Sequence, residues 1–148
     1  MESHWYQEAT CIFAFMPLQS EVDILAVLRD AYAHKHLALP VTQAEGTLTF
    51  HPVHTLSSLV RGRYNILEPA QTQIAEPDAR TLIIVPAMAY TPNHERLGRG
   101  KGYYDRYLSQ HRQSSTIGVC RTHQLLDHLP SASWDIPVMR VLCNGIFY

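Results

Sequence analysis

The sequence has few cysteines, no long apolar run and no positive charge near its start. Its three cysteines, Cys11, Cys120 and Cys143, are odd in number and widely spaced, which argues against a disulfide framework and a zinc knuckle. No apolar run is long enough to span a bilayer, so we expect no membrane partner. The first nine residues lack the basic start and apolar stretch of a signal peptide. These absences favour a cytoplasmic protein in a reducing compartment.

Positive charge is balanced over the whole chain and concentrated in one segment. The 12 Lys and Arg residues face 13 Asp and Glu residues, and none of the 12 precedes Arg29. This near-neutral balance argues against a general affinity for nucleic acid. Arg96, Arg99, Lys101 and Arg106 nevertheless fall within eleven positions of a glycine-rich stretch. A neutral protein with such a local cluster is expected to hold a small anion there.

The overall composition is that of a globular protein. Of the 148 residues, 46% are hydrophobic and 17% are charged, which fits one core of ordinary size. We find no repeat and no linker, so the sequence predicts a single domain over residues 1–148, with residues 1–9 as a flexible start. The nine histidines do not pair with cysteine or carboxylate at metal-ligand spacing, so surface or loop positions are favoured for them.

Short apolar segments alternate with helical patterns along the chain. The segment 81–85, TLIIV, is the clearest central strand because it is uncharged and rich in β-branched residues. Alternating strands and helices predict an α/β fold with a largely parallel central sheet and helices on both faces. The expected strands are residues 10–16, 37–41, 47–50, 81–85, 116–120 and 138–143. The expected helices are a segment from the capping-box-like residues 20–23 to about residue 34, a short one at 55–60, and one at 103–110.

The basic, glycine-rich segment joins the 81–85 strand to the 103–110 helix. Ligands of open α/β sheets bind beyond the carboxyl ends of strands, which is where this segment starts. Glycines allow backbone amides to approach phosphate oxygens, and arginine binds phosphate or carboxylate with two parallel hydrogen bonds. Asp105, one turn into the helix, can hold a magnesium ion against those phosphates. The spacing matches neither the Walker P-loop nor the dinucleotide fingerprint, so a flexible solvated turn is the alternative.

The residues 86–108, PAMAYTPNHERLGRGKGYYDRYL, resemble the signature of the 5-formyltetrahydrofolate cyclo-ligase (methenyltetrahydrofolate synthetase) family. Further similar segments follow in family order at residues 15–23, 39–40, 66–69 and 134–137. The resemblance implies an ATP- and magnesium-dependent conversion of 5-formyltetrahydrofolate to 5,10-methenyltetrahydrofolate, with release of ADP and phosphate. It implies a reduced formylfolate and ATP as partners, and we expect a monomer.

The resemblance also implies roles for individual residues. Contacts with ATP would come from Arg96, Leu97, Gly98, Arg99, Gly100, Lys101, Gly102, Tyr103 and Tyr104. Contacts with the folate would come from Met16, Glu21, Arg99, Gly100, Lys101, Gly102 and Tyr103. Magnesium would be held by Asp105 and Asp135. From the residues alone, each assignment has a structural alternative: Met16 as core, Glu21 and Asp105 as first-turn helix residues, Asp135 as a turn residue.

One feature of the family pattern has no counterpart in this sequence. Family members usually begin with an additional helical segment whose lysine and arginine bind ATP, whereas residues 1–9 hold no cation. The alternative function is therefore that of a catalytically impaired, truncated relative that binds folate or nucleotide for regulation. RNA binding through the Arg and Lys loop is a third hypothesis, which the near-neutral charge disfavours.

Overall fold

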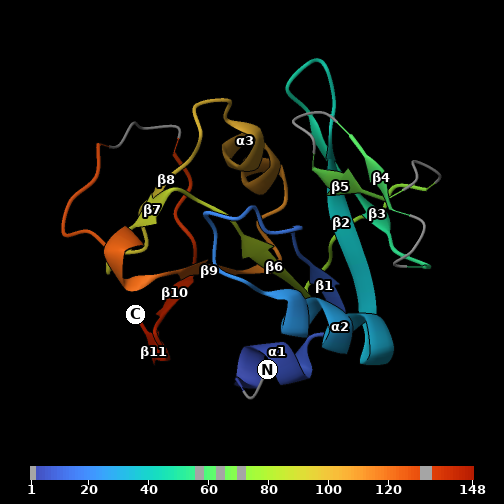
Figure 1. The fold of residues 1–148 in the computed structure, drawn as a ribbon, viewed down its shortest axis with the longest axis horizontal. Coiled ribbons are helices and arrows are strands. Elements are labelled where there is room, and N and C mark those ends of the chain that lie inside the picture. Colours follow the sequence, from blue (N-terminus) through green and yellow to red (C-terminus); the bar gives the residue numbers. More distant parts are fainter. Residues whose placement is uncertain (1–2, 56–58, 63–65, 70–72, 131–134) are drawn as a thin grey trace.

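A seven-stranded sheet forms the centre of the computed structural model, which describes residues 3–55, 59–62, 66–69, 73–130 and 135–148 (Figure 1). The strand order across the sheet is β11-β10-β9-β6-β1-β2-β3. The strands are β1 (Cys11–Phe13), β2 (His36–Thr42), β3 (Leu48–Pro52), β6 (Thr81–Val85), β9 (Ser115–Cys120), β10 (Arg140–Cys143) and β11 (Ile146–Phe147).

The middle of the sheet is parallel, and its two edges are antiparallel. Strands β10, β9, β6, β1 and β2 run parallel to one another, while β3 pairs antiparallel with β2 and β11 pairs antiparallel with β10. In the centre, Ile12 of β1 lies between Leu37 of β2 and Leu82 of β6. Parallel neighbours need crossover connections, which helices usually provide. The sheet confirms the predicted α/β class.

Helices cover both faces of this sheet. Helices α1 (His4–Glu8) and α2 (Leu25–His34) lie on one side, and α3 (Tyr103–Gln110) lies on the other (Figure 1). Alternate residues of β6 point to opposite faces, so Leu82 and Ile84 join the cluster under α1 and α2 while Ile83 and Val85 join the cluster under α3. Every residue of β6 is buried, as expected for a strand covered on both faces.

Two small hairpins and a short turn complete the described elements. Strands β4 (Val60–Arg61) and β5 (Leu67–Glu68) pair antiparallel, as do β7 (Ala89–Tyr90) and β8 (Arg96–Leu97). The 3-10 turn η3 covers Thr122–Gln124. Tyr90 donates its hydroxyl hydrogen to the carbonyl of Val85 and lies against Gly118 of β9, where an added Cβ would come within 2.3 Å of its ring. Glycine at this position therefore allows the β7–β8 hairpin to pack on the sheet.

Helix α2 begins later than the sequence predicted. It starts at Leu25 rather than near Ser20 because the acidic side chains before it hold a turn. The Glu21 carboxylate accepts a hydrogen bond from the Leu18 amide at 2.7 Å, and Asp23 accepts one from the Leu25 amide at 2.9 Å. Such local bonds from side chain to backbone compete with helix formation.

Further differences lie at the chain start, in two short segments, and at strand ends such as that of β10, which begins at Arg140 rather than at residue 138. A flexible start was predicted for residues 1–9, yet α1 occupies part of it, capped by Ser3 and anchored by Tyr6, whose residue surface is 5% exposed. The predicted strand 10–16 ends at Phe13. Of the helix predicted at 55–60, residues 56–58 lie outside the described residues, and Val60 belongs to β4 instead.

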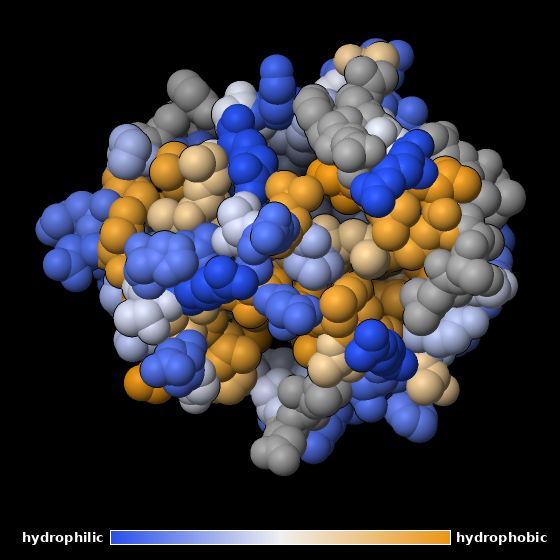
Figure 2. All heavy atoms as spheres, in the orientation of Figure 1, coloured by the Kyte–Doolittle hydropathy of each residue, from blue (hydrophilic) through white to orange (hydrophobic). Residues whose placement is uncertain are grey.

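Hydrophilic side chains lie between separate apolar patches on the face shown in Figure 2, so this surface is mixed in polarity.

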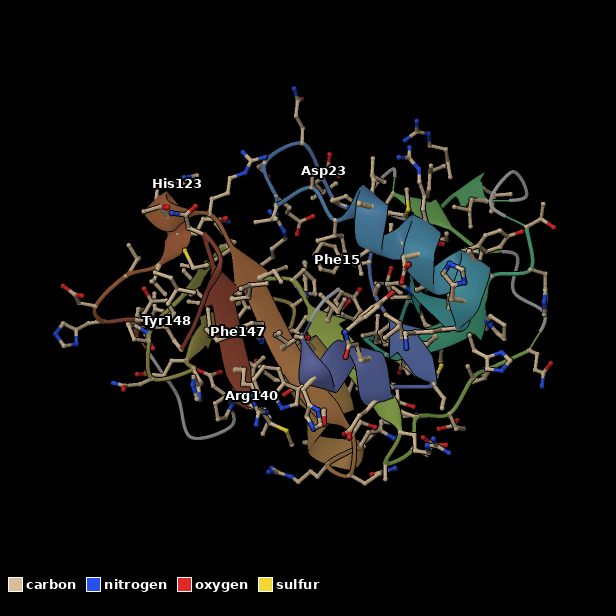
Figure 3. The ribbon with its side chains drawn as sticks, turned by 90° about the horizontal axis from the view of Figure 1, so that it is seen from below. Phe15, Asp23, His123, Arg140, Phe147 and Tyr148 are labelled. Carbon is tan, nitrogen blue, oxygen red and sulfur yellow. The ribbon has the colours of Figure 1, made fainter. Side chains whose placement is uncertain are left out.

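The first helix and the last strand of the described chain lie in contact. Trp5 of α1 packs edge-on against Phe147 of β11, with 5.0 Å between ring centroids, and the Arg140 guanidinium lies 3.9 Å from the Trp5 ring centroid. Figure 3 shows Arg140 and Phe147 at this end of the sheet. Within the described ranges, no helix has both the length and the apolar character needed to cross a membrane.

Candidate functional site

The candidate site lies at the carboxyl ends of β1, β6 and β9. Residues 14–24 follow β1, the β7–β8 hairpin and the glycine loop (residues 98–102) follow β6, and the η3 turn follows β9. Because β1, β6 and β9 are parallel neighbours, the three segments leave the sheet at the same edge. This edge is the usual ligand position in open α/β sheets.

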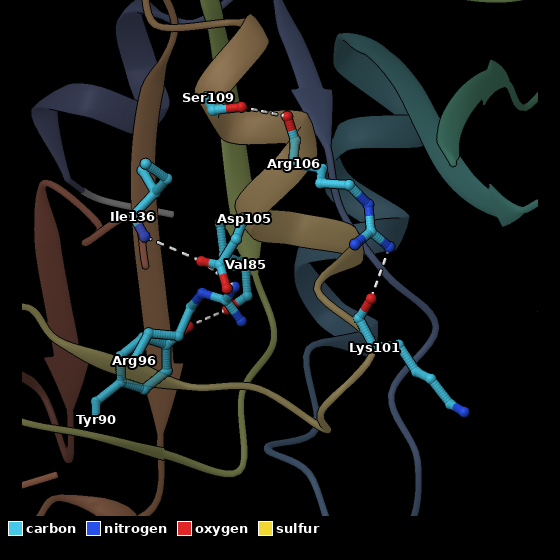
Figure 4. A network of polar contacts seen from close by, with 8 residues as sticks. All are labelled: Val85, Tyr90, Arg96, Lys101, Asp105, Arg106, Ser109 and Ile136. Carbon is cyan, nitrogen blue, oxygen red and sulfur yellow. Dashed lines mark hydrogen bonds and ion pairs between the residues drawn. The ribbon is translucent and has the colours of Figure 1, made fainter. Parts of the chain in front are cut away.

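A buried ion pair organises the hairpin and the helix that follows it. Arg96 of β8 donates from Nη2 to Oδ1 of Asp105 on α3 at 3.0 Å, and the two side chains are 4% and 19% exposed (Figure 4). The same carboxylate oxygen accepts a hydrogen bond from the Ile136 amide at 3.0 Å. Asp105 therefore joins β8, α3 and the segment before β10, and Arg96 is directed toward this carboxylate.

Two polar atoms at this ion pair, one in Arg96 itself and one in the adjacent Tyr104, are buried without a hydrogen-bond partner among the described residues. They are Nε of Arg96 and the hydroxyl of Tyr104, whose ring centroid lies 5.8 Å from the Arg96 guanidinium. Burial raises the pKa of Tyr104, while the positive charge of Arg96 acts in the opposite direction. Unpaired buried polar atoms are uncommon in native structures, and here two of them lie next to the glycine loop.

The glycine loop has the backbone that its composition predicts. Gly100 has φ of +93° and Gly102 has φ of +70°, a left-handed region that favours glycine. An added Cβ at Gly100 would meet nothing within 4 Å, so conformation rather than space requires glycine there. Arg106 donates to the carbonyls of Lys101 at 2.6 Å and Gly46 at 2.8 Å, which anchors the end of the loop. Arg106 thus has a structural role within the basic cluster.

The other two cations of the loop are exposed. Lys101 extends away from α3 (Figure 4), and the Arg99 side chain is 49% exposed. Nη2 of Arg99 lies 3.7 Å from Oε2 of Glu21, whose side chain is only 9% exposed. The structure therefore brings together the predicted folate-binding carboxylate and a cation of the predicted ATP loop. Met16 lies after β1 and packs against the core cluster under α1 and α2.

The two predicted magnesium ligands lie on segments that touch. The hydrogen bond from the Ile136 amide to Asp105 places Asp135, the preceding residue, beside the start of α3. In the part of the chain that the structure describes, no group of three or more His, Cys, Asp or Glu forms a metal cage. Magnesium usually takes one or two carboxylates together with phosphate oxygens and water. A partly exposed Asp105 with Asp135 nearby fits that mode of binding.

Two residues at this edge were missed in the sequence. Arg121 donates from Nη2 to the carbonyl of Glu21 at 3.0 Å, and Gln124 donates to the carbonyl of Met88 at 3.3 Å. Their position in the sequence could have revealed them, because Arg121 directly follows a predicted parallel strand and ligands of such sheets bind at the carboxyl ends of strands.

A groove of about 930 Å³ lies at the opposite edge of the sheet. It is lined by α1, by the end of α2 and by the amino ends of the strands, including Thr10, His36, Thr81 and Ser115. We place the candidate site at the carboxyl edge despite the size of this groove, because the glycine loop, its cations and the buried ion pair all lie there.

The fold and these contacts define an open, parallel α/β protein with its candidate site at the carboxyl edge of the sheet. Over residues 1–144 it matches the model of the 5-formyltetrahydrofolate cyclo-ligase family, and the chain belongs to that family. It is 33% identical over 141 residues to the 5-formyltetrahydrofolate cyclo-ligase of Escherichia coli K12, covering 90% of this chain and 78% of the relative. For the Mus musculus 5-formyltetrahydrofolate cyclo-ligase, the identity is 26% over 151 residues, covering 93% and 74%.

A solved structure gives the same result for the fold. The NMR structure of Aquifex aeolicus 5,10-methenyltetrahydrofolate synthetase superposes with a TM-score of 0.80 at 29% identity, covering 96% of this chain and 72% of that chain. The family resemblance and the fold class predicted from the sequence are thus confirmed. The roles of the individual site residues stay predictions.

Proposed function

We propose that the protein is an ATP- and magnesium-dependent 5-formyltetrahydrofolate cyclo-ligase that forms 5,10-methenyltetrahydrofolate, ADP and phosphate. Membership of this enzyme family supports the proposal. The observation that carries it is the ion pair between Glu21 and Arg99, which joins the expected folate contact to the expected ATP loop.

The proposed reaction consists of two displacements. The formyl oxygen attacks the terminal phosphorus of ATP, and the bond from that phosphorus to ADP breaks. A second folate nitrogen then attacks the activated formyl carbon and releases its proton to solvent, and the carbon–oxygen bond breaks so that phosphate leaves with the formyl oxygen. Holding two anionic ligands in line is the main task in phosphoryl transfer.

The residues of the site suit that task. Arg99 and Lys101, which are exposed, would bind phosphate oxygens together with the amides of the glycine loop. The Glu21 carboxylate would accept hydrogen bonds from N–H groups of the pterin ring. Asp105 and Asp135 would hold magnesium, which supplies charge neutralisation at the phosphates. Arg96 keeps Asp105 in place through its buried hydrogen bond.

The test is a turnover assay with purified protein, 5-formyltetrahydrofolate, ATP and magnesium, in which the absorbance of methenyltetrahydrofolate is followed. We expect turnover to require both ATP and magnesium and to be lost in Asp105→Ala. The exposed Asp127 provides the control, since Asp127→Ala should retain the wild-type rate. Absence of turnover in the wild type, or turnover without ATP, would refute the proposed function.

A further inference from the structure

The turn after β9, residues 121–126, forms hydrogen bonds with two other segments of the candidate site, the loop after β1 and the hairpin after β6. On one side, Nη2 of Arg121 donates to the carbonyl of Glu21 at 3.0 Å. On the other side, Gln124 donates from Nε2 to the carbonyl of Met88 at 3.3 Å, and the Leu126 amide donates to the carbonyl of Tyr90 at 2.8 Å. A single short segment thus joins the loop after β1 to the hairpin after β6.

The turn is also fixed within itself. The side-chain Oε1 of Gln124 accepts a hydrogen bond from the backbone amide of Arg121 at 2.9 Å. In return, the backbone amide of Gln124 donates to the backbone carbonyl of Arg121 at 2.9 Å. His123 of this turn and Asp23 of the loop after β1 lie on the same side of the molecule (Figure 3). The Arg121 side chain therefore starts from a well-held backbone and crosses to the neighbouring loop.

The contact of Arg121 with Glu21 leaves the carboxylate of Glu21 untouched. Arg121 bonds the main-chain carbonyl, whereas the carboxylate oxygens meet the Leu18 amide at 2.7 Å and the Arg99 guanidinium at 3.7 Å. Arg121 thus fixes where the backbone of Glu21 lies without neutralising the group that would bind a ligand.

We infer that Arg121 is a positioning residue for the reduced formylfolate. It holds the Glu21 loop against the β9 turn, and through Gln124 the same turn holds the hairpin that leads to the ATP loop. The inference rests on the proposed function, in which Glu21 contacts the folate. Arginine suits the role because its planar guanidinium reaches a carbonyl with fixed geometry, which a lysine ammonium reproduces only in part.

The kinetic test compares Arg121→Met, Arg121→Lys and Arg112→Met. Methionine keeps an unbranched apolar stem and removes the donor, and the exposed Arg112, just beyond the end of α3, is the matched control. We expect Arg121→Met to raise the KM for 5-formyltetrahydrofolate about tenfold, as for loss of a hydrogen bond from a charged group, with less than about threefold change in kcat and in the KM for ATP. The formylfolate KM of Arg121→Lys should lie between those of the wild type and of Arg121→Met. An unchanged formylfolate KM in Arg121→Met would overturn the inference.

Amide hydrogen exchange separates this inference from the proposed function. In Arg121→Met, peptides covering residues 15–24 should exchange about tenfold faster than in the wild type and in Arg112→Met, because the loop loses its anchor. Equal exchange in all three proteins would overturn the positioning role whatever the enzyme does. Faster exchange combined with a wild type that shows no turnover would support the anchoring of Glu21 and reject the proposed function.

Discussion

Asp105 accepts a 3.0 Å hydrogen bond from Arg96, a residue that lies nine positions earlier and whose side chain is 4% exposed. This contact distinguishes Arg96 from the exposed cations of the glycine loop. Arg96 is buried and directed at a carboxylate, whereas Arg99 and Lys101 are exposed and remain accessible to a ligand.

We expect Arg96→Ala to lower the free energy of unfolding by about 2 kcal/mol, because it removes a charge-assisted hydrogen bond and leaves Asp105, whose side chain is 19% exposed, with only the Ile136 amide as a partner. Urea unfolding followed by circular dichroism measures the change. Arg112→Ala, at an exposed arginine, is the control and should stay within about 0.5 kcal/mol of the wild type. Equal stability of the two variants would show that the ion pair does not organise the site.

The proposed magnesium role of Asp105 predicts a specific effect of Asp105→Asn. The amide keeps an acceptor for the Ile136 N–H group and for Arg96 but removes the negative charge, so some stability is lost and thermal unfolding shows that the variant is folded at the assay temperature. We expect the magnesium concentration for half-maximal ATP binding to rise at least about tenfold, since magnesium prefers charged oxygen ligands. Calorimetric titration at several magnesium concentrations measures this, with Asp127→Asn as the control. An unchanged magnesium dependence would remove Asp105 from the metal site.

The exposed loop cations should contribute directly to ligand affinity. We expect Arg99→Ala and Lys101→Ala each to weaken binding of ATP and of 5-formyltetrahydrofolate about tenfold, through loss of charge-assisted hydrogen bonds. Equilibrium titration of each ligand against each variant tests this, and thermal unfolding shows whether the fold is intact. If both variants bind both ligands as the wild type does, the assignment of the loop is wrong.

Stability should fall at alkaline pH, in part through Cys120. Burial, together with the neighbouring Cys143, raises the pKa of the Cys120 thiol from 9.0 to about 12. The folded state holds this proton more tightly, so the stabilisation is complete below pH 9 and is lost as the pH rises toward about 12. We expect Cys120→Ala to lose less stability than the wild type between about pH 8 and about pH 10.5 in urea unfolding. An equal loss in both proteins would contradict the shift.

Much of the fold was predictable because it follows from hydrophobic pattern. The strand at 81–85 and the helix at 103–110 have the predicted bounds, since one is buried on both faces and the other places Tyr107 and Leu108 in the core. Pattern did not give the start of α2, where Glu21 and Asp23 bond backbone amides of a turn. Their side chains are equally typical of a helix start.

The site was predictable as a segment but not as a set of contacts. Arg96, Arg99, Lys101 and Arg106 carry the same charge in the sequence, and tertiary packing alone decides which of them pair with Asp105 or with backbone carbonyls. Arg121 escaped notice because its partner is the main-chain carbonyl of Glu21, a group present at every residue.

The destination of the formyl oxygen tests the central claim most directly, namely that ATP activates the formylfolate at this site by phosphoryl transfer. The measurement uses 5-formyltetrahydrofolate that carries heavy oxygen in its formyl group and observes the released phosphate by phosphorus NMR. We predict that each phosphate formed with methenyltetrahydrofolate carries one heavy oxygen. Methenyltetrahydrofolate formed together with unlabelled phosphate would contradict the claim.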